Sequence, residues 1–202
     1  MTHPKHATSD HEILDIIRHR WSPRAFDPDR AIPAGDLRTL FEAARWAPSS
    51  YNEQPWRFVV ADRTSSPEAF AALFETLAEN NRTWAGLAPT LILVAAATQL
   101  QRFSGVNRHA WYDAGQAVAF LSLQATSLGL FVRQMEGFDR EAARRVCAIP
   151  ADYDPVVTIA LGYTGDPAAL TIERYRVAES QSRGRQRIDD FVFDGVWGKG
   201  MT

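Results

Sequence analysis

The sequence has one cysteine, no long apolar run and no excess of charge, and each of these absences excludes a class of protein. Cys147 cannot form a disulfide within the chain, which excludes a disulfide scaffold and indicates a reducing compartment. The most apolar run, Leu91 to Ala97, is too short to span a bilayer, and the first residues lack the apolar core of a signal peptide. We therefore expect a cytoplasmic protein that does not associate with membranes.

Charge and motifs narrow the possible functions further. Lys and Arg together number 22 against 24 for Asp and Glu, so nothing indicates a general attraction to nucleic acid. The sequence contains no HExxH, no CxxC, no serine nucleophile elbow and no GxGxxG. We expect no metal site, no hydrolytic chemistry and no Rossmann-type nicotinamide site.

Hydrophobic periodicity predicts alternating helices and strands in a single domain spanning residues 1–202. Ser9 and Glu12 form a capping box that predicts a helix over 10–20, and Thr90 to Ala97 is apolar throughout, as in strands buried on both faces. Further strands are expected at 56–61, 131–134 and 156–161, and further helices after Pro33, after Ser66, and over 111–128 and 140–148. This order predicts an α/β or α+β class with helices on both faces of the sheet.

The two ends of the chain are expected to differ from this core. Residues 1–9 are predicted to be flexible, and residues 180–202 to form a C-terminal arm. The arm is rich in arginine at first and turns apolar and aromatic from Ile188 to Trp197. An apolar arm usually docks on another surface, and a partner subunit is one candidate.

Three polar segments suit a phosphorylated, flat, redox-active ligand. Arg20 to Arg24 offers two arginines and a hydroxyl as a phosphate clamp, although arginines are also favoured at a helix C-terminus. Ala47 to Trp56 places serines and amides directly before a strand, which fits either a binding loop or an ordinary turn. Arg183 and Arg185 supply further cations, or else belong to a solvated basic tail.

These segments together resemble the nitroreductase family of FMN-dependent NAD(P)H oxidoreductases. The resemblance runs from about Ile13 to Trp197 and follows the order of the family's landmarks. The matching stretches are Arg20-Trp21-Ser22-Pro23-Arg24-Ala25-Phe26, the specific signature from Ala44 to Trp56, Asn81 with Trp84, Asp113-Ala114-Gly115, Glu136-Gly137-Phe138-Asp139 and Arg185 to Trp197.

The resemblance implies a fold and a set of cofactor-binding residues. The fold would be α+β, with a central, mostly antiparallel sheet flanked by helices, in a homodimer with exchanged arms and shared active sites. Arg20, Ser22 and Arg185 would hold the FMN phosphate, helped by Arg183 and by the backbone of Trp21, and Arg24 would lie near the N1–O2 edge of the ring. The other subunit would supply Ser49, Ser50 and Asn52, Asn81 would bond the pyrimidine edge, and Glu136 and Gly137 would face N5 mainly through backbone N–H groups.

The implied reaction is hydride transfer from NADH or NADPH to flavin N5 and then to a nitroaromatic, quinone or flavin acceptor. No catalytic side chain is assigned, since the flavin carries the chemistry. Alternatives are a flavin-dependent dehydrogenase or dehalogenase that NAD(P)H does not reduce, and a non-catalytic module that binds flavin or contacts RNA. The stretch between Ala97 and Asp113 is shorter than in some family members, so His109, Trp111 and Tyr112 could line the mouth of the site instead.

Overall fold

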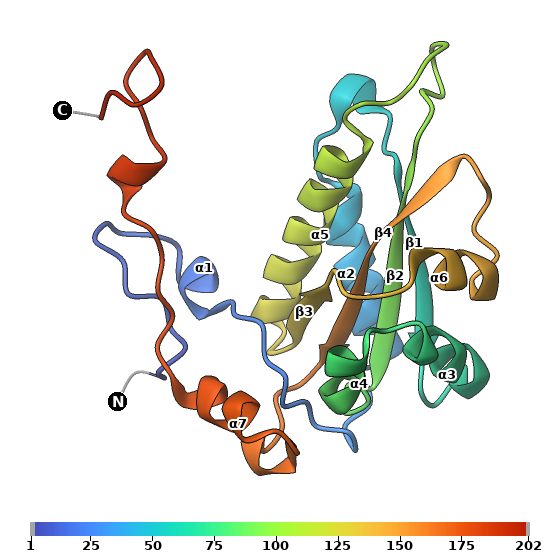
Figure 1. Cartoon of the computed structure of the whole chain (residues 1–202), viewed down its shortest axis with the longest axis vertical. Coiled ribbons are helices and arrows are strands. Elements are labelled where there is room, and N and C mark those ends of the chain that lie inside the picture. Colours follow the sequence, from blue (N-terminus) through green and yellow to red (C-terminus); the bar gives the residue numbers. More distant parts are fainter. Residues whose placement is uncertain (1–2, 201–202) are drawn as a thin grey trace.

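The computed structural model describes residues 3–200 and contains one four-stranded sheet (Figure 1). Its strands are β1 (Trp56–Asp62), β2 (Thr90–Ala97), β3 (Phe131–Met135) and β4 (Tyr153–Gly162), in the order β1-β2-β4-β3. Every neighbouring pair is antiparallel, which confirms the predicted α+β fold with a mostly antiparallel sheet.

Seven helices and three short 3-10 turns surround the sheet in the described residues. The helices are α1 (Asp15–His19), α2 (Ala34–Arg45), α3 (Pro67–Glu75), α4 (Glu79–Ala85), α5 (Ala110–Ser127), α6 (Arg140–Val146) and α7 (Glu173–Ser180). The 3-10 turns are η1 (Ser50–Asn52), η2 (Pro167–Ala169) and η3 (Ile188–Asp190).

Strand β2 is buried along its whole length because helices cover both faces of the sheet. Its side chains alternate between the faces. Ile92 and Val94 join the core that includes residues of α2 and α5, whereas Leu91 and Leu93 join the core that includes residues of α3 and α4. The apolar run in the sequence therefore marks the strand at the centre of two cores.

The predicted helix over residues 10–20 is wrong in its first half. Residues 10–14 are not helical, and α1 begins only at Asp15. The predicted capping box does not form, because the N-cap of α1 is Leu14 and the Ser9 hydroxyl is buried without a hydrogen-bond partner. The backbone N–H of Ala7 donates to the carbonyl of Arg18, at 2.9 Å. This contact requires the chain to turn back between the two residues, which a helix starting at residue 10 would not allow. The hydrogen bond between Ala7 and Arg18 therefore forms in place of the predicted first helical turns.

The N-terminal and C-terminal segments lie on the same side of the sheet (Figure 1). Arg183, which follows α7, donates hydrogen bonds to the carbonyls of Arg18 and Arg20, and the Lys5 ammonium donates to the carbonyl of Ala178. Beyond these contacts the C-terminal arm continues away from the sheet and ends in exposed apolar side chains. Across residues 3–200, none of the helices has both the length and the apolar character needed to cross a bilayer.

Candidate functional site

The structure brings Arg20, Ser22 and Arg183 into one hydrogen-bonded group. Arg20 is the C-cap of α1 and has extended backbone angles, as expected just before the Ser22-Pro23 pair, which disfavours helix. Its guanidinium donates to the Ser22 hydroxyl at 3.1 Å, and its carbonyl accepts a 2.7 Å hydrogen bond from Arg183 Nη1. A segment from early in the chain and the start of the arm thus form one basic surface.

This basic surface carries positive charge that the protein itself does not neutralise. Burial, together with Arg183 and Arg185, lowers the pKa of Arg20, and burial and Arg185 lower the pKa of Arg183. In the described part of the chain, none of the ion pairs involves these three arginines, and Arg183 Nε is buried without a hydrogen-bond partner. Clustered guanidinium groups with free donors are suited to binding an anion such as a phosphate.

Arg24 is held beside this surface by a buried acid that the sequence analysis missed. The Glu179 carboxylate, on α7 and only 6% exposed, accepts the backbone N–H groups of Arg24 and Ala25 at 3.1 to 3.3 Å. The Arg24 guanidinium stacks 4.3 Å from the ring of Tyr175, and its Nε is buried without a partner. Glu179 lies in a polar stretch with no feature that distinguishes it from a solvent-exposed residue.

Arg133, on β3, is a second residue that the sequence analysis missed. Its Nη1 donates a 2.6 Å hydrogen bond to the carbonyl of Ser22, and its guanidinium lies 5.2 Å from the ring of Trp84. Burial, with a smaller contribution from Arg24, lowers the pKa of Arg133 to about 10. A charged residue directly after the apolar stretch Leu130 to Val132 was the available signal.

Asn81 and Gly137 are also brought together. Asn81 Nδ2 donates to the Gly137 carbonyl at 2.9 Å, and the backbone N–H of Ala78 donates to the same oxygen at 2.9 Å. A Cβ on residue 137 would lie 3.0 Å from Asn81 Nδ2 and 3.3 Å from Ala78 Cβ, so a side chain there would force these neighbours to shift. The neighbouring Glu136 carboxylate is exposed and lies 3.4 Å from Arg140, which leaves its backbone as the group available here.

The loop with Ser49, Ser50 and Asn52 is strained and tightly tied. Tyr51, Asn52 and Gln54 all have positive φ, between 48° and 55°, a conformation that non-glycine residues adopt only where surrounding contacts impose it. Ser49 Oγ accepts the Gln54 N–H, and Asp113 accepts the Ser50 N–H, both at 3.0 Å. Such overdetermined strain is common at functional sites.

A second buried acid ties the same loop to the stretch that follows β2. The Glu53 carboxylate accepts the backbone N–H groups of Gln101 and Arg102, at 2.7 and 3.2 Å. The Tyr51 and Phe103 rings pack edge to face with their centroids 5.2 Å apart. The loop therefore has contacts both to α5 and to residues 101–103.

Within one chain this loop does not meet the basic surface, because the two lie at opposite ends of the sheet. The loop leads into Trp56, which pairs with Ala96 near the end of β2. The basic segment leads to Phe26, which bridges to Thr164 just beyond the other end of β4. Eight residues of β2 separate these ends by roughly 24 Å at the usual rise of a strand.

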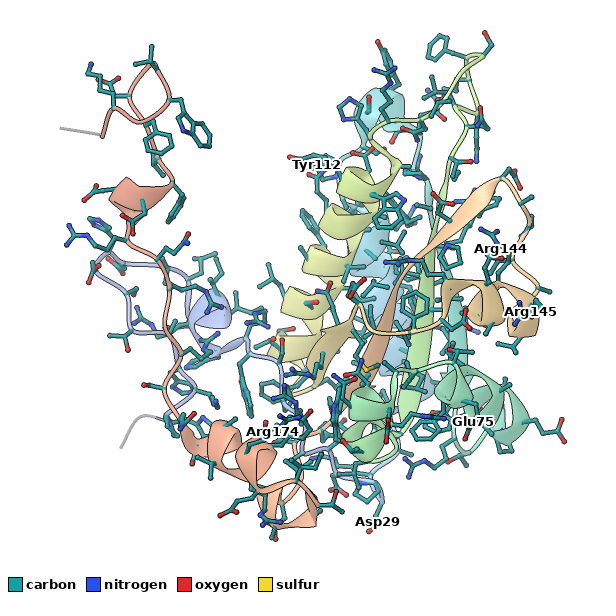
Figure 2. The ribbon with its side chains drawn as sticks, viewed as in Figure 1. Asp29, Glu75, Tyr112, Arg144, Arg145 and Arg174 are labelled. Carbon is teal, nitrogen blue, oxygen red and sulfur yellow. The ribbon has the colours of Figure 1, made fainter. Side chains whose placement is uncertain are left out.

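The aromatic residues considered for the mouth of the site lie at the loop's end of the molecule. Trp111 Nε1 donates to the Asp154 carboxylate at 3.3 Å, and Tyr112 projects from the first turn of α5 (Figure 2). His109 precedes that turn as the N-cap of α5. Trp21, by contrast, buries its side chain against Phe131, with centroids 5.9 Å apart, so its backbone is the part left for a ligand.

Comparisons with known proteins agree with this fold. A model of the Nitroreductase family matches residues 17–163. A solved structure described as an oxidoreductase containing FMN superposes with a TM-score of 0.88 at 31% identity, covering 98% of this chain and 100% of that chain.

Two relatives match at the level of sequence. An uncharacterized 15.4 kDa protein from the ask 5' region of Mycolicibacterium smegmatis is 36% identical over 149 residues, covering 70% of this chain and 97% of the relative. A Stenotrophomonas maltophilia (strain K279a) protein named "Putative NADH dehydrogenase/NAD(P)H nitroreductase" is 29% identical over 183 residues, covering 82% of this chain and 91% of the relative.

Proposed function

This chain belongs to the nitroreductase family, and we propose that it is an FMN-dependent oxidoreductase using NADH or NADPH to reduce a nitroaromatic, quinone or flavin acceptor. The observation that carries the proposal is the basic surface of Arg20, Ser22 and Arg183, with Arg185 near enough to lower the pKa values of both arginines. Uncompensated guanidinium groups fit a dianionic phosphate. The similar structure that contains FMN supports this assignment.

Four further residues would suit the flavin ring of the cofactor: Arg24, Asn81, Glu136 and Gly137. Arg24 would place positive charge at the edge of the ring where negative charge gathers on reduction, and Asn81 would bond the pyrimidine edge. The backbone at Glu136 and Gly137 would approach the ring closely, which the absence of a side chain at Gly137 allows. Bound FMN would supply hydride chemistry at N5, and the protein would orient the ring and set the charge around it.

We also propose that the enzyme is a homodimer in which each site takes Ser49, Ser50 and Asn52 from the partner subunit. Two copies would be needed because these residues lie at the opposite end of the sheet from the basic surface. Exposed apolar side chains on α5 and on the arm fit burial at such an interface. They include Phe120, Ile188, Phe191, Val196 and Trp197.

An anaerobic absorbance titration of the purified protein with NADH and then NADPH tests the function. We expect a bound-flavin spectrum that at least one nucleotide bleaches and that an added quinone or nitroaromatic restores. A flavin spectrum that neither nucleotide bleaches would replace the reductase with a flavin enzyme of the dehydrogenase or dehalogenase type. Protein that binds no flavin would overturn the proposal. Because the chain has a single cysteine and needs no disulfide, the protein for this test can be expressed in a reducing cytoplasm.

A further inference from the structure

Two charged side chains that the proposed function does not use, half-buried Arg133 and buried Glu179, hold the same short segment of backbone. Arg133 reaches it from β3 and donates to the Ser22 carbonyl at 2.6 Å. Glu179 reaches it from α7 and accepts the N–H groups of Arg24 and Ala25. These contacts fall on Ser22, Arg24 and Ala25, within or directly beside the segment that carries Arg20, Ser22 and Arg24.

Placing the charged side chain of Arg133 at this position costs free energy, because burial disfavours the charged form. Its guanidinium is partly removed from water and lies near the positive charge of Arg24, and it forms no ion pair within 4 Å among residues 3–200. At a half-buried strand position such as this one, an apolar side chain is often as stable as a charged one or more so. Structural stability alone therefore gives no reason for an arginine at this position.

Glu179 offsets part of the positive charge without neutralising the segment. It faces Lys5 and Arg133, and its carboxylate oxygens accept backbone N–H groups. The guanidinium groups of Arg20, Arg24 and Arg183 remain outside any ion pair in the described residues. The two side chains thus fix the backbone while leaving the cations available to an anion.

We propose that Arg133 and Glu179 are positioning residues that hold the Arg20–Arg24 segment in its phosphate-binding conformation before the cofactor arrives. The inference rests on the proposed function, in which this segment binds the FMN phosphate. Organising the segment in advance increases affinity, because less conformational freedom is lost on binding.

Comparing FMN with riboflavin separates this role from a merely structural one. Both ligands have the same ring, and only FMN has the phosphate. For Arg133→Gln we expect the dissociation constant of FMN to rise at least about tenfold, which is about 1.4 kcal/mol, while that of riboflavin changes less than about threefold. Arg133→Lys keeps the charge and a donor, so it should restore much of the preference for FMN.

Glu179→Gln separates positioning from charge. Removing a negative charge near a phosphate site would by itself tighten FMN binding. Loss of the carboxylate that orders two backbone N–H groups would loosen the segment and weaken FMN binding, which is the result we expect. Tighter FMN binding by Glu179→Gln would overturn the positioning role.

Arg144→Gln is the matched control. Like Arg133, Arg144 donates to backbone carbonyl groups, in its case those of Pro150 and Tyr153, both at 2.7 Å. It lies on α6, across the molecule from α7 and its labelled Arg174 (Figure 2). We expect this variant to leave the ratio of FMN to riboflavin affinity unchanged.

The experiment is isothermal titration calorimetry of the full-length wild type and the four variants with FMN, riboflavin and inorganic phosphate, after circular dichroism has confirmed folding. Weaker binding of both phosphate and FMN by Arg133→Gln supports the inference. If the wild type does not bind FMN, the proposed function fails, but weaker phosphate binding by Arg133→Gln still supports the inference. Equal losses for FMN and riboflavin, or a wild type that binds neither FMN nor phosphate, would overturn it. If Arg133→Gln does not fold, Arg133→Lys and Glu179→Gln decide the question.

Discussion

The carboxylate of Asp113, in the first turn of α5, accepts a 3.0 Å hydrogen bond from the backbone N–H of Ser50. Asp113 is 1% exposed, so water cannot replace this contact. The bond anchors a loop in which Tyr51 and Asn52 have left-handed backbone angles. A helix that packs on the sheet thereby fixes the residues that we propose for the partner's flavin site.

Asp113→Ala should destabilise the fold by about 1–3 kcal/mol, because it leaves the Ser50 N–H without its acceptor. Asp113→Asn should cost less, since its amide oxygen can still accept. Urea denaturation measures both. Glu68→Ala, at an exposed first-turn position of α3, should cost less than about 1 kcal/mol. An Asp113→Ala variant as stable as Glu68→Ala would show that the anchor contributes nothing.

Gly137→Ala should destabilise by about 1–3 kcal/mol, because its Cβ would press against Asn81 Nδ2 at 3.0 Å. Truncating the neighbour in Asn81→Ala should relieve part of this cost, giving a coupling of at least about 0.5 kcal/mol in a double-mutant cycle. Gly35→Ala, in open space within α2, should be neutral or stabilising by up to about 1 kcal/mol. Strict additivity of Gly137→Ala and Asn81→Ala would contradict the close contact.

Arg20→Ala should weaken FMN binding by about 1.5–3 kcal/mol, the usual contribution of a hydrogen bond to a charged group. The proposed dimer should remain, because Arg20 makes a charge contact and is not part of the apolar core. Quenching of flavin fluorescence measures the affinity, and light scattering measures the mass. Arg38→Ala, an exposed position on α2, is the control. Full flavin occupancy in Arg20→Ala would mean that the phosphate lies elsewhere.

Deleting residues 188–202 should convert the proposed dimer to a monomer and release the flavin. The deleted stretch includes Trp197, which is 92% exposed and packs only against Phe193, with centroids 5.0 Å apart, among the aromatic contacts of the described residues. Analytical ultracentrifugation gives the mass, and thermal unfolding checks that the sheet and its helices remain folded. A shortened chain that stays dimeric would show that the arm is not needed for assembly.

Cys147 should be a slow nucleophile, because burial raises the pKa of its thiol above the ordinary 9.0. A disulfide reagent at pH 8 should react with it more slowly than with free cysteine. The thiol of the unfolded chain loses its proton at a lower pH than the thiol of the folded chain. The contribution of this group to the free energy of unfolding is therefore fully present below pH 9.0 and is lost as the pH rises through the higher pKa of the folded state. Denaturation of the wild type and Cys147→Ala across this pH range measures the effect.

Features coded by neighbouring residues were predictable from the sequence. The apolar run of β2 gave both ends of that strand, and Gly129 ends α5 with the positive φ expected of a capping glycine. The family signature gave the order of the landmarks. The local pattern failed at residues 10–14, which are not helical in the structure, where the chain turns back so that Ala7 can bond to Arg18.

Contacts between distant residues were decided only by the tertiary structure. Ser22 and Arg133 are 111 positions apart, and Arg24 and Glu179 are 155 apart, so no periodicity or spacing joins them. Hydrophobic patterning specifies which side of an element is buried. Whether a charged side chain can be buried depends on the hydrogen-bonding groups that the fold places opposite it, which can come from any part of the sequence. The sequence by itself determined the strands, most of the helices and the arginine-rich segments, and the packing of β3 and α7 against residues 20–25 determined which charges hold that segment in place.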